Sequence, residues 1–279
     1  MSEISAAAVK LLREQTGLPM MDCKRALQET GGDPARAVEW LRKQGKKVAE
    51  KRAGRSTSSG RIAVYADFAA RAGAIVDLRC ESAPVANNEQ FIDLANDLAK
   101  QLATGPGATM PDELLGQPST QGTGQTLARR LEDLLNRIRE AFKLERIVRL
   151  DGCCAGYAHH NGAVGVLVGL EGGDAALGRD IAMHIAAMRP SVVRRDQLDP
   201  AALDKEREIL AEAARKEGKP EKIIAKMVEG RLKDYYAERC LLEQPHANRE
   251  KYGGKTIGEL AAAAGMTVLS FVHWELPKE

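Results

Sequence analysis

Aromatic residues make up only 4% of this 279-residue chain, and long apolar runs are missing from it. The longest apolar stretch, Val164 to Leu170, is interrupted by glycines and is too short to span a bilayer. The chain starts with polar residues and lacks the apolar region of a signal peptide. Its five cysteines include no Cys-x-x-Cys pair, so we expect no disulfide framework. These absences predict a reduced, cytoplasmic protein with aliphatic, helix-rich cores.

Signatures of catalysis are also missing. No Gly-rich phosphate loop of Walker type, no His-Glu-x-x-His and no Gly-x-Ser-x-Gly occurs. Cys153-Cys154 and His159-His160 have no second ligand pair at suitable spacing, and neighbours on a strand point to opposite faces, so we expect no metal. His184 lies on the apolar face of a predicted helix, which favours a hydrogen-bonded core histidine. We predict no enzymatic chemistry and no cofactor.

Residues 1–45 carry the signals of three short helices. Ser5 is placed to cap the first, and Gly17 to end it. Gly31-Gly32 closes the second, and Asp33-Pro34 is the order preferred at the start of a third. We predict a small three-helix bundle, which is a common interaction module.

A basic linker is predicted at residues 46–60. Arg42 to Arg55 contain seven Lys or Arg and a single acid, Glu50. Such a run can bind phosphates, but it is more often solvated, and the aromatic side chains typical of single-strand binders are missing. The net charge of +2 is too small to indicate nucleic acid. A nucleic-acid-binding role stays an alternative that the salt dependence of RNA binding would test.

The middle of the chain repeats one design, two strands followed by a helix. The strands are predicted at 61–68 and 74–80, then at 152–159 and 163–170, and 147–150 and 267–276 are candidates for third strands. An α+β fold follows, with two small antiparallel-sheet-plus-helix subdomains at 61–150 and at 151–199 with 256–279. Residues 104–126 read as an inserted loop and 127–142 as a helix.

The first strand pair delivers an exposed tip. Pro84 must end the preceding strand because it lacks an N–H group. Asn87 or Asn88 can then cap an amphipathic helix that begins near Phe91. A strand that leads through a short turn into a helix suits presentation to a partner, although an ordinary connection would look the same.

Residues 200–255 predict a protruding helical hairpin. Its helices, 200–217 and 220–240, are joined by Gly218-Lys219-Pro220. The apolar positions that form narrow seams are Leu203, Leu210 and Ala214 on one helix, and Ile224, Met227 or Val228, and Tyr235 on the other. An antiparallel coiled-coil arm of about 27 Å is expected from this length.

Several segments of the chain resemble bacterial elongation factor Ts. These are Thr16-Gly17, Met20 to Leu27, Gly32-Asp33, Ala37 to Arg42, Ile181 to Ala187 with Arg189-Pro190, and Gly218 to Pro220 with Lys226 to Arg231. Their order and spacing hold from about residue 3 to residue 276. The resemblance implies a bundle of the ubiquitin-associated type and a non-catalytic nucleotide exchange factor for the GTPase elongation factor Tu.

The resemblance also implies which residues contact the GTPase. By position in the family's motifs these are Leu18, Met20, Met21, Asp22, Cys23, Lys24, Ala26, Ser82, Ala83, Pro84, Val85, Val164 and His184. The helical hairpin would be the family's coiled-coil arm. Homodimerisation is left open, because some family members dimerise through the segment inserted in the core, here 104–142.

The tip departs from the family pattern. The family typically has Thr-Asp-Phe-Val-Ala where this chain has Ser82-Ala83-Pro84-Val85-Ala86. The resemblance implies that the missing Phe wedges between helices of the GTPase and that the missing Asp lies near its magnesium ion. Two hypotheses follow. The chain is an exchange factor that uses its other contacts, or it is a binding and holding protein with weak exchange activity.

Overall fold

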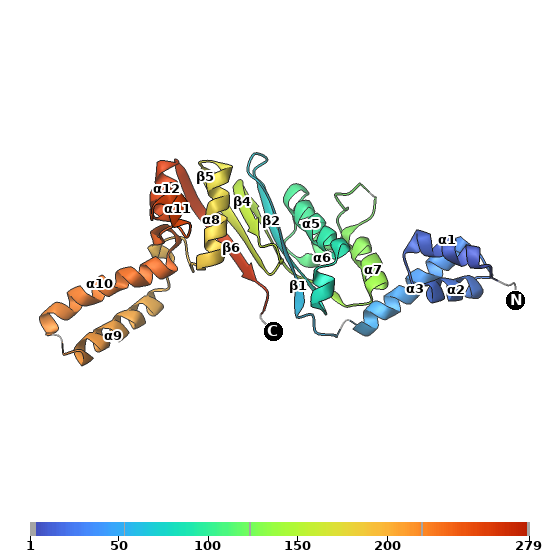
Figure 1. Cartoon of the computed structure of the whole chain (residues 1–279), viewed down its shortest axis with the longest axis horizontal. Coiled ribbons are helices and arrows are strands. Elements are labelled where there is room, and N and C mark those ends of the chain that lie inside the picture. The colour runs from blue at the N-terminus through green and yellow to red at the C-terminus, as the bar shows by residue number, and fades with distance from the viewer. Residues whose placement is uncertain (1–3, 53, 123, 219, 278–279) are drawn as a thin grey trace.

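The computed structural model describes residues 4–52, 54–122, 124–218 and 220–277. A three-helix bundle lies at one end of the molecule, two β-sheets occupy its middle, and a hairpin of two helices projects from the other end (Figure 1). The α+β class, with two small antiparallel sheets, is confirmed.

The bundle forms as its capping signals predict. Its helices are α1 (Ala6–Thr16), α2 (Met20–Glu29) and α3 (Pro34–Arg52). The Ser5 hydroxyl accepts a hydrogen bond from the amide of Ala8, and Gly17 ends α1 in the left-handed conformation. The Asp33 carboxylate caps α3 by accepting from two amides of its first turn. The bundle core is aliphatic, with Val9, Leu12, Cys23, Ala26, Leu27, Ala37 and Leu41 buried.

The third helix is longer than predicted. Residues 46–52, expected to be linker, continue α3 to Arg52. Lys and Arg are good helix formers, so a basic run does not by itself end a helix. Gly45 lets α3 pass close to Asn136, because a Cβ there would lie 2.3 Å from that side chain. This crossing places the bundle against the rest of the molecule.

Six strands make the two sheets. The first has the order β1 (Ser59–Asp67), β2 (Ala72–Cys80), β3 (Phe142–Asp151), and the second has β4 (Cys153–Ala158), β5 (Val164–Gly172), β6 (Met266–Glu275). Both candidate third strands are therefore confirmed. β3 starts earlier than expected, and the helix predicted at 127–142 ends as α7 (Leu127–Ile138). Arg139, in the left-handed conformation, turns the chain between them.

Helices cover the outer faces of the sheets. α5 (Glu89–Thr104) packs on the first sheet and α8 (Ala175–Met188) on the second. Two short helices, α4 (Ala83–Ala86) and α6 (Pro111–Leu115), interrupt segments that were expected to be irregular. The Asn88 side chain caps α5, as one of the two expected candidates.

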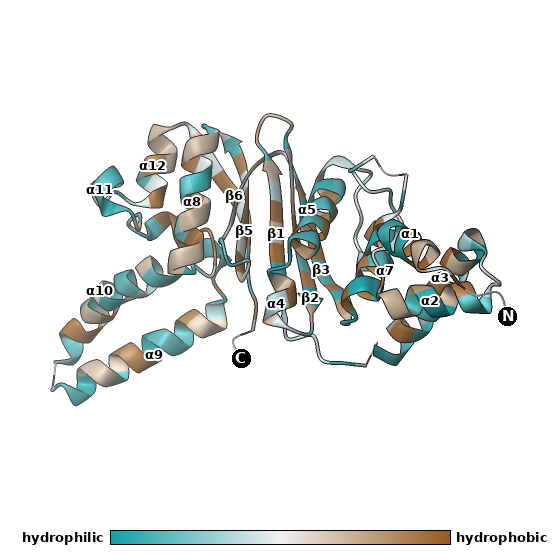
Figure 2. Cartoon of the chain, turned by 45° about the vertical axis from the view of Figure 1, so that its right-hand side comes forward, coloured by the Kyte–Doolittle hydropathy of each residue, from teal (hydrophilic) through white to brown (hydrophobic). Residues whose placement is uncertain are grey.

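The inner faces of the sheets pack against each other. Ile62 and Ile75 of the first sheet form one buried cluster with Cys154 and Leu167 of the second. The molecule therefore has four layers at its centre, namely α8, the second sheet, the first sheet and α5 (Figure 2). Cys153 belongs instead to the cluster under α8, so the adjacent cysteines point to opposite faces as expected.

The hairpin consists of α9 (Pro200–Lys216) and α10 (Glu221–Arg239). The predicted seam residues Leu203, Leu210, Ala214 and Ile224 pack together, and Val228 is the buried member of the pair left open. α11 (Arg249–Tyr252) and α12 (Ile257–Ala263) then lead back to β6.

Candidate partner-binding surface

The loop before α2 and the first two turns of that helix contain seven of the predicted contact residues, some exposed and some buried. Met20 and Met21 are 50% and 69% exposed, and Lys24 is also exposed. Cys23 and Ala26 are fully buried in the bundle core beneath them. Large exposed apolar side chains are typical of contact sites, so the two methionines and Lys24 present the surface that the buried residues support.

The remaining two residues of this set are half-buried. Leu18 packs against the edge of the bundle core. Asp22 forms an ion pair with Arg139, the residue that ends α7. Because these partners lie more than a hundred residues apart in sequence, no local pattern indicates the pair. The ion pair links the first turn of α2 in the bundle to the residue that follows α7.

The tip after β2 is a single helical turn, α4, with a fixed base. The amide and hydroxyl of Ser82 donate to the two carboxylate oxygens of Glu140, at 3.0 and 2.6 Å. Val85 is half-buried and packs on the core of the first sheet. Ala83 and Pro84 are exposed. Of the four predicted tip residues, two therefore anchor the turn and two project from it.

Glu81, just before the tip, is fully engaged in contacts within the chain. Its carboxylate accepts from the Ala141 amide at 2.7 Å, from Arg52 at 2.8 Å and from Arg55 at 3.1 Å. These hydrogen bonds hold the pKa of the Glu81 carboxylate below its usual value, and the bond from the Ala141 amide has the largest effect. Glu81 therefore offers no free acid in place of the missing Asp of the family pattern. The end of the basic run is tied to this carboxylate.

His184 is buried within α8, with 1% of its surface exposed. Its Nδ1 accepts from the amide of Ala247 at 3.0 Å, so Nε2 carries the proton and donates to Gln244 Oε1 at 2.9 Å. Burial lowers the pKa of His184 to about 4. The expectation of a hydrogen-bonded core histidine is confirmed. The side chain has almost no surface with which to touch a partner directly.

Gln244 extends this contact to the base of the arm. It is fully buried, and its side-chain amide donates to the carbonyl oxygen of Glu238, in the last turn of α10, at 2.8 Å. α8 and α10 are thus joined through two side chains. Sequence reasoning missed Gln244 because nothing in its local pattern distinguishes it.

The surface beside His184 belongs to other residues. Met183 and Met188 of α8 are exposed, and Val164 is half-buried at the start of β5, where it pairs with Glu275. The predicted residues thus lie on the bundle, on the tip and on the second sheet with its helix (Figure 1). They form separate patches along the molecule and no single cleft, an arrangement suited to a large partner.

Two further observations concern the described ranges. Within them, no three His, Cys, Asp or Glu side chains gather in a way that could hold a metal ion. No helix in the described part of the chain is long and apolar enough to cross a membrane.

Comparison with known proteins gives consistent similarities. Residues 81–278 match the family model described as elongation factor TS. The chain is 41% identical over 276 residues to elongation factor Ts of Thioalkalivibrio sulfidiphilus, covering 98% of this chain and 92% of that protein. It is 47% identical over 259 residues to elongation factor Ts of Rhodospirillum centenum, covering 88% and 82%. Elongation factor Ts of Clostridium botulinum is 40% identical over 283 residues, with 98% and 92% covered.

Proposed function

The chain belongs to the elongation factor Ts family, and we propose that it is a nucleotide exchange factor for elongation factor Tu in translation elongation. The observation that carries this proposal is the similarity to elongation factor Ts along 98% of the chain, at 41% identity. We infer for the same reason that the bundle is of the ubiquitin-associated type, that the hairpin is the family's coiled-coil arm, and that the protein is cytoplasmic. The chain supplies contacts to the GTPase and no catalytic group of its own.

The mechanism that we propose is thermodynamic linkage. A protein that binds nucleotide-free elongation factor Tu more tightly than the GDP-bound form lowers the affinity for GDP by the same factor. The binding energy comes from several separate patches, among them Met20, Met21 and Lys24 on the bundle and the exposed side of α8. His184 contributes indirectly, because its hydrogen bond to Gln244 holds α8 and the base of α10 together.

The tip has a different role in nucleotide exchange from the one that the family pattern implies. Ala83 and Pro84 supply neither an acid nor an aromatic ring, and Glu81 is held by Arg52 and Arg55. We propose that Ala83-Pro84 approaches the GTPase as a rigid apolar turn, on the base made by Ser82 and Glu140. Exchange then rests on the bundle and on α8 more than on the tip.

The first test is the rate at which fluorescent GDP leaves elongation factor Tu of the same organism, by stopped flow. We expect this protein to accelerate release by orders of magnitude. A double variant, Met20→Glu with Met21→Glu, should lose most of this acceleration, because it places charge in a desolvated contact.

The matched control is Met110→Glu, since Met110 is 60% exposed on a different element, at the start of α6. It should leave the rate unchanged. Tight association without faster GDP release would reject exchange and leave the holding role. Homodimerisation through residues 104–142 stays a prediction, which sedimentation of the free chain would test.

A further inference from the structure

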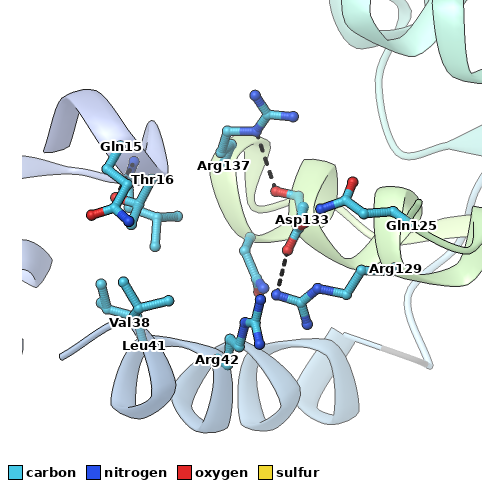
Figure 3. A pocket seen from close by; sticks show the side chains of 11 residues that line it. Gln15, Thr16, Val38, Leu41, Arg42, Gln125, Arg129, Asp133 and Arg137 are labelled. Carbon is cyan, nitrogen blue, oxygen red and sulfur yellow. Dashed lines mark hydrogen bonds and ion pairs between the residues drawn. The ribbon is translucent and has the colours of Figure 1, made fainter. Parts of the chain in front are cut away.

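In the described part of the chain, the bundle and the first sheet share no apolar core. The buried cluster of the bundle draws on residues of 4–41 alone, and the cluster beneath α5 contains no residue of the bundle. A cavity of about 320 Å³ lies between the bundle and α7. The bonds drawn in Figure 3, from Arg129 and Arg137 to Asp133, both lie within α7. Polar contacts elsewhere must therefore hold the bundle in its direction.

Two segments of the core bind each other at the base of the tip. Glu81, which follows β2, accepts from the amide of Ala141 at 2.7 Å. Glu140 accepts from the amide and the hydroxyl of Ser82, at 3.0 and 2.6 Å. Each segment thus supplies the carboxylate that binds an amide of the other. We call residues 81–82 and 139–141 the junction.

The junction is bonded to the bundle at two points. Glu81 accepts from Arg52, in the last turn of α3, at 2.8 Å, and Arg139 forms an ion pair with Asp22, in the first turn of α2. The side chains of Arg52 and Glu81 are only 24% and 19% exposed, so water screens this pair less than a surface pair. With the close crossing of α3 and α7 at Gly45, these two points define the direction of the bundle.

The backbone at Arg139 points to a role for its side chain. Its φ is 63°, and it ends α7 in the left-handed conformation. Glycine is the usual residue at such a helix end, because a residue with a Cβ is strained there. An arginine accepts this strain, and its guanidinium binds the Asp22 carboxylate of the bundle.

We propose that the junction sets the direction of the bundle relative to the tip, and that Arg52, Glu81 and Arg139 are positioning residues for nucleotide exchange. The inference rests on the proposed function, since it concerns how the methionines of α2 and the exposed turn of α4 reach one GTPase together. Domains joined by a small polar interface move relative to each other unless something fixes them. The apparent affinity for a partner falls with the fraction of chains in the competent orientation. By raising that fraction, the junction strengthens binding of the GTPase.

The first measurement uses the free chain without the GTPase. Nitroxide labels at Lys10→Cys on α1 and Lys100→Cys on α5 report the distance between bundle and core by pulsed electron paramagnetic resonance. Both positions are exposed, and the native cysteines are buried. We expect a narrow distribution of distances that widens in the double variant Arg52→Gln, Arg139→Gly. An unchanged width in this variant would overturn the proposal.

The second measurement is GDP release from elongation factor Tu at increasing concentrations of this chain. The double variant should need about tenfold more protein for half-maximal acceleration, and each single variant about threefold more, in the range of partly exposed ion pairs. The maximal rate should stay the same, because the side chains that meet the GTPase are unchanged. Arg139→Lys keeps a positive charge near Asp22, so it should recover most of the affinity that Arg139→Gly loses.

Arg71→Gly and Lys51→Gln are the matched controls. Arg71 shares the left-handed conformation of Arg139, but it lies in the turn between β1 and β2, at the opposite end of these strands from the tip. Lys51 is exposed beside Arg52 on α3. Both variants should leave the distances and the exchange kinetics unchanged.

The outcomes separate this proposal from the exchange function. Wider distances and a higher half-maximal concentration, confined to the Arg52 and Arg139 variants, would support the junction. A lower maximal rate at an unchanged half-maximal concentration would indicate direct contact with the GTPase and overturn the positioning role. Absence of any acceleration by the wild-type chain would refute the exchange function, whereas the distances in the free chain would still support or overturn the junction.

Discussion

His184 shows how one buried side chain fixes its own protonation state. Its Nδ1 faces the amide hydrogen of Ala247, so a proton on that nitrogen would meet another donor. The ring therefore stays neutral, and burial lowers its pKa to about 4. His246 stacks near it, with ring centroids 5.3 Å apart, and burial lowers the pKa of His246 as well.

This arrangement predicts an acid-sensitive fold. The folded pKa of His184 is about 4 and the ordinary value is 6.5, so the unfolded chain binds the proton more readily between these values. Stability is fully present above pH 6.5 and falls by on the order of 3 kcal/mol as the pH drops to 4. Urea unfolding across this range should show the loss.

A His184→Gln variant should be less stable at pH 7 but should lose less on acidification, because one of the two buried imidazoles is gone. His160 is exposed, so His160→Gln should leave the pH dependence unchanged. Identical pH dependence in the wild-type chain and the His184 variant would contradict the assignment.

Among the elements, α4 carries the Ala83-Pro84 pair that the resemblance predicts to differ from the family pattern, and its position is well fixed by hydrogen bonds. Ser82 is bonded to Glu140, and the Asn87 side chain donates to the carbonyl of Ala83 at 3.0 Å. The turn can therefore carry new side chains at Ala83 and Pro84 without losing its base.

A double variant, Ala83→Asp with Pro84→Phe, restores the family's pair at the exposed positions. An aromatic anchor at an interface can contribute about 2 kcal/mol or more, so we expect about a thirtyfold faster release of GDP than with the wild-type chain. The stopped-flow measurement described above checks this. Thermal unfolding is the control, since both positions are exposed and the midpoint should change little. An unchanged rate with an unchanged midpoint would mean that the tip does not reach the nucleotide site.

Local signals predicted elements well, and long-range contacts poorly. Ser5, Gly17 and Asn88 mark helix ends through bonds to residues two to four positions away, so their roles are readable from sequence. The pairing of Glu81 with Arg52 and Arg55 is not, because it appears only when β2 and the end of α3 are brought together. The length of α3 is hard to predict from the sequence for a related reason. The last turns of the helix are basic and polar, and they make their contacts with distant parts of the chain, such as the ion pair of Arg52 with Glu81.

The residues of the candidate site divide in the same way, into those that the sequence predicts and those that only the fold shows. The exposure of Met20, Met21, Ala83 and Pro84 is what a contact surface requires, and their contact with the GTPase stays a prediction. The burial of Cys23 and Ala26 was not anticipated, because a family motif mixes surface residues with the core that supports them. Gln244 could not be found at all without the fold.

For the whole molecule, the face-to-face packing of the two sheets sets the distance between the bundle and the arm. Each sheet and its helix carries one end of the molecule, and Gly73, Gly156 and Gly165 allow the inner faces to meet closely. A Cβ on Gly165 would lie 2.3 Å from Cγ2 of Ile62, a stiff, fully buried side chain on β1 of the first sheet. The separate patches can engage one large partner together only if this spacing is kept.

Gly165→Ala should therefore act on the molecule as a whole. Overpacking at the sheet interface should lower the free energy of unfolding by about 1–3 kcal/mol, and faster exchange of β1 and β5 amides with solvent should accompany it. Gly230→Ala is the matched control. Gly230 is exposed within α10, and a Cβ added there would meet no described atom within 4 Å beyond the neighbouring backbone of its own helix. Alanine should therefore raise the free energy of unfolding by about 0.5–1 kcal/mol. Urea denaturation compares the two variants. Equal stability of both would mean that the sheets can separate without cost, and that the spacing of the partner-binding patches must then be set by the partner.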